Sequence, residues 1–144
     1  MEQRLSLVTL GVADLHAAHS FYERLGWHGQ EVQETVFFQA GGLAVSLWSR
    51  EKLAADLGVT DHASDSFGGI ALAHNVHSPA EVDEILAAAD EAGATITRAA
   101  AETFYGGYAG AFCDLDGHSW EIAHNPAFSL ADDGTITLPD FSAD

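Results

Sequence analysis

Apolar and polar residues alternate along short stretches of the chain, and segments with helical periodicity lie between them. Residues 5–12 alternate with a period of two, which predicts a strand whose two faces differ. The next apolar positions fall at helical spacing over 15–25, after Asp14, which can cap a helix. Gly26 supplies the left-handed residue that commonly ends such a helix.

Strand-like segments follow Trp27, and the last two of them predict a β-hairpin. Residues 34–40 and 43–48 are rich in β-forming types, and Gly41-Gly42 between them suits a tight turn. If Ala40 pairs with Leu43, one face of the hairpin carries core residues: Val36, Phe38, Val45 and Leu47. The other face carries the remaining side chains: Phe37, Gln39, Ser46 and Trp48.

The second half of the chain repeats this order. Residues 69–76 alternate as a strand. The Ser-Pro-Ala-Glu sequence at 78–81 supplies a cap, a first-turn proline and a capping-box glutamate, which together predict a helix start. This helix should end near Gly93, and a short strand should follow at 94–98.

The last two predicted strands, 108–113 and 118–124, are joined by the strong turn signal Asp-Leu-Asp-Gly. Pairing of Cys113 with His118 places one set of side chains on a common face: Tyr108, Phe112, Ser119 and Glu121. The opposite face then points two residues into the core: Trp120 and Ile122.

Both halves therefore have the order β-α-β-β-β, which predicts an α+β fold of two tandem modules. The boundaries are module 1 at about 5–48, a connector at 49–67, module 2 at about 68–125 and a C-terminal tail at 126–144. The connector should contain a short helix at 50–57, and the tail an isolated strand at 135–138. Since 144 residues is the size of one ordinary domain, we expect a single domain over 1–144.

The composition is that of a globular protein, with 47% hydrophobic and 19% charged residues. Five Lys and Arg against 22 Asp and Glu give a formal charge of −17. Nucleic acids and anionic membranes attract proteins through Lys and Arg, so we expect neither as a partner. One cysteine and no signal-like N-terminal segment predict a cytoplasmic protein.

Two sequence motifs, together with the repeat, resemble one known family. DLHAAHSFYERLGW stands in the first half and DLDGHSWEIAHNP near the end. In this context they are similar to the vicinal oxygen chelate superfamily, which comprises glyoxalase, bleomycin-resistance and extradiol-dioxygenase proteins. The resemblance covers about residues 5–126. It implies two curled mixed sheets that form a cup around a ligand, with the helices on the outer face.

The resemblance also implies where a divalent metal would bind, because the family's enzymes hold it with His and Glu from the first and last strand of each half. Those positions fall at about four residues: Leu7, Ser46, Gly69 and Glu121. Only Glu121 is a good ligand, whereas catalytic sites use about three protein ligands. We therefore expect no metal or other cofactor, with a divalent metal as the alternative.

Aromatic side chains are expected to surround the ligand. The predicted ligand-binding residues are Phe37, Ser46, Trp48, Tyr105, Tyr108 and Phe112. Tyr105 belongs to the glycine-flanked loop 104–107, which could fold over the mouth of the cup. Glu121 is the candidate catalytic residue or ligand anchor. Among aromatic rings, its desolvated carboxylate would have a raised pKa, which suits a general base or a counter-ion for a cationic ligand.

Two other clusters have simpler structural interpretations. His74 and His124 lie in repeated Ala-His-Asn segments and point away from the cup, which predicts a hydrogen-bonded pair at the sheet end; a metal pair outside the cup is the alternative. Cys113 and His118 could form an activated thiolate, but a buried cysteine is usually an apolar filler.

Three functions remain open from sequence alone. The first is a metal-free protein of the glyoxalase and bleomycin-resistance type that encloses a small aromatic ligand, which could also be cationic. The second is an enzyme, a glyoxalase-like lyase, isomerase or dioxygenase, that uses Glu121 as a base or a divalent metal. The third is an interaction module with a vestigial cup. A chain with two half-size units often pairs with itself, so we expect a homodimer.

Overall fold

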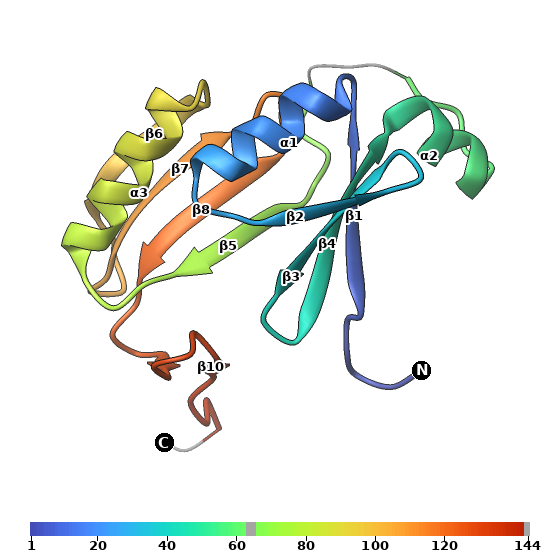
Figure 1. The fold of residues 1–144 in the computed structure, drawn as a ribbon. Helices are drawn as coiled ribbons and strands as arrows, with labels where there is room; N and C mark the ends of the chain where they lie inside the picture. The colour runs from blue at the N-terminus through green and yellow to red at the C-terminus, as the bar shows by residue number, and fades with distance from the viewer. Residues whose placement is uncertain (63–65, 143–144) are drawn as a thin grey trace. The chain divides into compact units, whose positions relative to one another are not determined.

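The computed structural model describes residues 1–62 and 66–142. The chain forms two compact units, one of Met1–Gly69 with Leu115–His118 and one of Ile70–Asp114 with Ser119–Asp144. Each unit is built around a four-stranded sheet (Figure 1). The predicted α+β fold with two mixed sheets is therefore confirmed.

The first unit contains the first β-α-β-β-β sequence. Its elements are β1 (Leu7–Val12), α1 (Leu15–Arg24), β2 (Gly29–Val32), β3 (Thr35–Ala40), β4 (Leu43–Ser49) and α2 (Arg50–Leu57). The strand order is β1-β4-β3-β2, in which β1 and β4 are parallel and the other pairs are antiparallel. The hairpin register is as predicted, since Ala40 pairs with Leu43 and Phe37 with Ser46.

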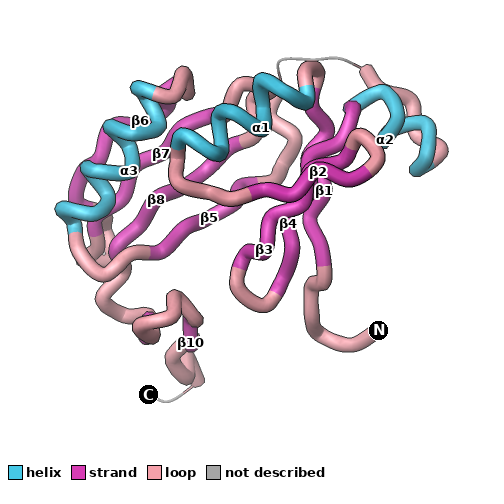
Figure 2. The backbone as a smooth tube through the Cα atoms, in the orientation of Figure 1, coloured by secondary structure: helices cyan, strands magenta, loops and turns pink. Residues whose placement is uncertain are grey.

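The second unit repeats this topology. Its elements are β5 (Ala71–Asn75), α3 (Pro79–Glu91), β6 (Thr95–Glu102), β7 (Tyr108–Cys113) and β8 (Ser119–His124), followed by β9 (Ser129–Leu130) and β10 (Ile136–Thr137). The sheet order is β5-β8-β7-β6, in which β5 lies beside β8 (Figure 2). These two strands are parallel. Two strand predictions need correction: β6 continues to Glu102, and the tail strand is not isolated because it pairs with β9.

The helix boundaries follow the sequence signals. Asp14 caps α1 by accepting a hydrogen bond from the Ala17 amide, and Ser78 caps α3 by accepting from Glu81. The Glu81 carboxylate accepts from the His77 amide at 2.8 Å, which satisfies another free donor at this helix start. No helix among the described residues is both long and apolar enough to span a membrane.

Each sheet buries the face that packs against its long helix. In the first unit the Phe38 ring lies 5.8 Å from Tyr22 of α1 and 5.3 Å from Trp27, measured between ring centroids. In the second unit, Phe112 and Trp120 stack on the α3 side with their ring planes 13° apart. The opposite face, away from α1 in the first sheet and away from α3 in the second, is called here the distal face of each sheet.

The predicted register of the β7–β8 hairpin is wrong by one residue. Cys113 pairs with Ser119 rather than with His118, so Glu121 lies opposite Ala111 instead of Gly110. Because side chains alternate between faces along a strand, this shift moves the β7 side chains to the other face relative to β8. Phe112 thus pairs with Trp120 on the α3 side and does not share a face with Glu121.

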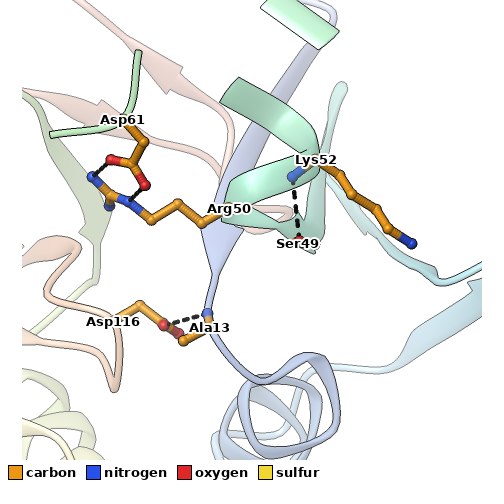
Figure 3. Close-up of polar contacts among 6 residues, drawn as sticks. All are labelled: Ala13, Ser49, Arg50, Lys52, Asp61 and Asp116. Atoms are coloured by element: carbon orange, nitrogen blue, oxygen red, sulfur yellow. Dashed lines mark hydrogen bonds and ion pairs between the residues drawn. The ribbon is translucent and has the colours of Figure 1, made fainter. Parts of the chain in front are cut away.

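The turn between β7 and β8 is fixed by a hydrogen bond within the first unit. The Ala13 amide donates to Asp116 Oδ1 at 2.8 Å, and Arg50 nearby donates two hydrogen bonds to Asp61 at 2.8 and 2.9 Å (Figure 3). The hydrogen bond and charge of Asp61 raise the pKa of Arg50, and Asp116 adds to this effect. Arg50 in turn lowers the pKa of Asp61.

We expect Asp116→Ala to lower the free energy of unfolding by about 1–2 kcal/mol, because it removes a hydrogen bond to a charged acceptor that is partly screened by water. Asp116→Asn keeps an acceptor oxygen at the same place and should cost less than half as much. Urea unfolding of both variants measures the difference. Equal losses would show that the charge beside Arg50, and not the bond to Ala13, stabilises this turn.

Candidate functional site

The distal face of the first sheet carries a polar pair beside aromatic rings. Strand pairing aligns one residue from each strand in a row: Thr9, Ser46, Phe37 and Gln30. The hydroxyl oxygens of Thr9 and Ser46 lie 2.9 Å apart, and Ser46 is 1% exposed. Phe37 is 41% exposed. In the next row, half-buried Trp48 lies opposite Gly11, which has no side chain to cover the indole.

The distal face of the second sheet carries an ion pair on a floor of small residues. The row that corresponds to the one above consists of Ala73, Glu121, Ala111 and Arg98. Arg98 Nη2 donates a hydrogen bond to Glu121 Oε2 at 2.9 Å, across the methyl group of Ala111. The Arg98 and Glu121 side chains are 55% and 39% exposed.

The environment of Glu121 differs from the one that the sequence predicts. Tyr108 and Phe112 do not share its face, and its carboxylate is bonded to Arg98 instead of being desolvated among rings. The cation expected beside Glu121 is thus supplied by the chain itself. Arg98 is a candidate site residue that the sequence reasoning missed. One signal was available, since Arg98 is the only Lys or Arg after residue 52.

Tyr108 and Phe112 belong to the side of the second sheet that faces α3. Phe112 is 2% exposed and stacks on Trp120. The Tyr108 hydroxyl donates to Asp83 of α3 at 2.9 Å, and this hydrogen bond raises the pKa of Tyr108. Both side chains therefore lie on the side of the sheet that packs against α3. The prediction that they share a face with Glu121 is wrong.

Tyr105 lies in a tight turn between β6 and β7. The Gly107 amide donates to Thr103 Oγ1 at 3.0 Å, and the Thr103 amide donates to the Gly107 carbonyl. Phe104 is 101% exposed, and the Tyr105 ring packs edge-on against it with 5.3 Å between the ring centroids. The turn thus presents two aromatic rings to solvent.

The residues at the family's metal positions do not fit a divalent ion. At the four positions that the resemblance gives, Leu7 and Gly69 have no donor atom, the Ser46 hydroxyl bonds to Thr9, and the Glu121 carboxylate is bonded to the Arg98 guanidinium. The residues paired opposite Ser46 and Glu121 are Thr9 and Ala73, and they add neither a carboxylate nor an imidazole. Among residues 1–62 and 66–142, no group of three His, Cys, Asp or Glu side chains could hold an ion.

The remaining candidates lie away from these rows. His74 and His124 pair with Ile122 and Tyr108, so both point to the α3 side, as predicted. His124 Nδ1 lies 3.3 Å from the Val76 carbonyl oxygen, and burial of the His74 ring lowers its pKa. The Cys113 sulfur lies 3.8 Å from the Ser119 hydroxyl, so the predicted cross-strand neighbour His118 is replaced by a serine.

Comparison with known proteins identifies the fold and the family. The sequence model of the Glyoxalase/Bleomycin resistance protein/Dioxygenase superfamily matches residues 4–122. A glyoxalase-related enzyme from Fulvimarina pelagi is 36% identical, with a TM-score of 0.87 over 95% of this chain and 99% of that one. No match was found among curated proteins.

Two more distant structures share the fold. The fosfomycin resistance protein FosX from Mesorhizobium loti is 20% identical, with a TM-score of 0.65 over 87% of this chain and 94% of that one. A bleomycin resistance determinant encoded on the transposon Tn5 is 17% identical, with a TM-score of 0.60 over 86% of this chain and 99% of that one.

Proposed function

The chain belongs to the Glyoxalase/Bleomycin resistance protein/Dioxygenase superfamily, and from this premise we propose that it binds a small aromatic molecule without a resident metal ion. One observation carries the proposal. The four positions that the resemblance gives for a metal hold Leu7, Ser46, Gly69 and Glu121, of which Ser46 is bonded to Thr9 and Glu121 to Arg98. Such a set can hydrogen-bond an organic ligand but is a poor cage for a divalent ion.

The ligand-binding residues that we propose come from the distal faces and the β6–β7 turn. Phe37 and Trp48 offer ring faces for stacking, and aromatic pairs contribute about 0.5–1.5 kcal/mol beyond area burial. Ser46 adds a hydroxyl, and Tyr105 an aromatic ring held by its turn. Glu121 is the polar anchor together with Arg98. A preference for cationic ligands does not enter the proposal, because Arg98 already balances that carboxylate.

An enzymatic function is the second candidate, and one finding favours it: the 36% identity to a glyoxalase-related enzyme over nearly the whole chain. In that case Glu121 would be the base that accepts a proton from the substrate. Glu121→Gln keeps the shape of the side chain but removes its basicity. Turnover of a bound compound that is lost in this variant would favour the enzyme, and a compound that both forms bind but neither converts would favour the binding protein.

We also propose a cytoplasmic homodimer with a small organic ligand and with neither nucleic acid nor membrane as a partner. The net charge of −17 supports the last two points, because both surfaces are negatively charged. Light scattering coupled to gel filtration tests the dimer directly, since one chain has a mass of 15.2 kDa.

The metal content gives the sharpest test of the proposed function. We expect tag-free protein, purified without chelator or metal column, to contain less than about 0.1 Ni, Mn, Fe or Zn ion per chain, because the part of the chain that the structure describes offers no group of three donors. Elemental analysis measures this value before and after dialysis against each ion. One ion per chain that survives gel filtration would contradict the proposal and establish the metal-dependent alternative.

The ligand itself can be sought by thermal shift with a panel of small aromatic compounds. A compound that binds the folded chain raises its melting temperature in a saturable way. Trp48→Ala should reduce this shift, whereas the same substitution at Trp27, which packs against Tyr22 and Phe38, should lower the melting temperature itself. If no compound stabilises the protein, the binding function loses its support.

A further inference from the structure

Arg98 is the only Lys or Arg in the second unit. Of the five basic residues, four lie at positions 4–52, and Arg98 alone stands in the second half of a strongly acidic chain. The other three arginines and the one lysine have local partners: Glu2, the Ser20 carbonyl, Asp61 and Glu34. A single positive side chain on a sheet face therefore needs its own explanation.

Irregular strand pairing on both sides of Arg98 sets the direction of its side chain. The pairing of β6 with β7 shifts register on both sides of Arg98, between Ile96 and Arg98 and again between Arg98 and Ala101. Such bulges redirect a side chain and are enriched next to active sites. The bulged backbone comes so close to β7 that a Cβ atom at Gly110 would lie 3.1 Å from the Arg98 carbonyl oxygen.

Most of the Arg98 guanidinium is free to bind something else. Of its five N–H groups, one bonds to Glu121, and among residues 1–62 and 66–142 no other acceptor for Arg98 is found. Exposed ion pairs of this kind contribute little to stability, so the pair is not needed to hold the sheet together. The other two residues of the row are Ala73 and Ala111, so no larger side chain in this row covers the guanidinium of Arg98.

We infer that Arg98 binds a carboxylate of the small molecule, on the distal face of the second sheet, and that Glu121 is the residue that positions the guanidinium. The planar fork of arginine matches a carboxylate with two parallel hydrogen bonds, and its cation complements the ligand's negative charge. This inference rests on the proposed binding function and names its ligand class: an aromatic carboxylate.

Three matched probes test the inference: 2-naphthoate, its neutral amide 2-naphthamide, and the cation 2-naphthylmethylammonium. Titration of ¹⁵N-labelled protein, followed by amide chemical shifts, gives each affinity. We expect naphthoate to bind about tenfold more tightly than naphthamide, since charge-assisted bonds are roughly twice as strong as neutral ones. The largest shifts should fall at Ala73, Arg98, Ala111 and Glu121.

Variants separate Arg98 from Glu121. Arg98→Gln should reduce naphthoate affinity about tenfold, to the level of naphthamide, and leave naphthamide unchanged. Arg98→Lys keeps the positive charge but loses the planar guanidinium, so its naphthoate affinity should lie between those of the wild type and Arg98→Gln. Glu121→Gln keeps an oxygen that can accept the hydrogen bond from Arg98, so the guanidinium stays in position, and it removes a negative charge beside the ligand; naphthoate should therefore bind at least as tightly as before. Arg24→Gln, which makes the same change of net charge on α1, is the control and should change nothing.

Several results would overturn the inference. If Arg98→Gln leaves naphthoate affinity unchanged, or if the ammonium probe binds best and Glu121→Gln abolishes its binding, the carboxylate assignment is wrong while the proposed binding function stands. If none of the probes binds, the inference also fails, and the broader thermal-shift panel decides the binding function separately. Circular dichroism of each variant confirms that these exposed substitutions leave the fold intact.

Discussion

Replacement of Phe112 by alanine is expected to lower the free energy of unfolding by about 3–5 kcal/mol, which is the usual cost of removing a buried aromatic ring. Phe112 is 2% exposed, and its ring is stacked on Trp120 with 6.3 Å between the centroids. Alanine would leave a cavity between the second sheet and α3 that the surrounding residues could fill only in part. Urea unfolding followed by circular dichroism measures the loss.

The same variant distinguishes the two possible faces of Phe112. On a ligand-binding face, its truncation would weaken ligand affinity and cost little stability. The control is Phe37→Ala on the distal face of the first sheet, where the ring is 41% exposed. We expect this change to cost less than about 1 kcal/mol. Equal stability losses in the two variants would contradict the β7–β8 register described above.

The sequence predicts register well where a turn leaves no alternative. Two glycines between the strands of the first hairpin fix the pairing of Ala40 with Leu43, and all four predicted core residues are buried. The capping residues define the helix starts for the same reason, since Asp14 and Ser78 each satisfy a free amide at a helix start. These signals are local, so a single chain segment contains all the information.

The β7–β8 register could not be predicted in this way. The Asp-Leu-Asp-Gly turn is compatible with pairing of Cys113 with either His118 or Ser119, and one residue decides which face every side chain takes. The pattern of β7 gives no help, because Ala109 and Ala111 suit either face. Stacking of Phe112 on Trp120 decides the register, and it is a contact between strands that no local pattern contains.

The sequence shows which metal ligands are scarce at the candidate site but not how its side chains are arranged. Leu7 and Gly69 have no donor atom, and Thr9 and Ala73, which pair opposite Ser46 and Glu121, are poor ligands too. The Arg98–Glu121 ion pair could not be predicted from the sequence. It depends on two bulges in β6, and a bulge breaks the alternation from which facing residues are inferred.

The second large effect is expected at Gly110, where two physical terms oppose each other. Alanine in a strand is usually favoured over glycine by about 0.5–1 kcal/mol, because it loses less backbone entropy on folding. A Cβ atom at Gly110, however, would lie 2.4 Å from Leu86 Cδ1 and 3.1 Å from both the Ala100 nitrogen and the Arg98 carbonyl oxygen. The Leu86 methyl group can turn away, but the two backbone atoms belong to the bulged segment and cannot.

We therefore expect Gly110→Ala to destabilise the protein by about 1–3 kcal/mol, the usual cost of overpacking a buried site. Gly42→Ala is the matched control, because a Cβ there meets nothing within 4 Å. Its effect should stay within about 0.5 kcal/mol. Urea unfolding of both variants gives the comparison. The backbone atoms that the new methyl group would meet belong to Ala100 and to Arg98 itself, so Gly110→Ala should also shift the Arg98 amide resonance. A variant with unchanged stability and an unchanged spectrum would contradict the close approach of β6 to β7.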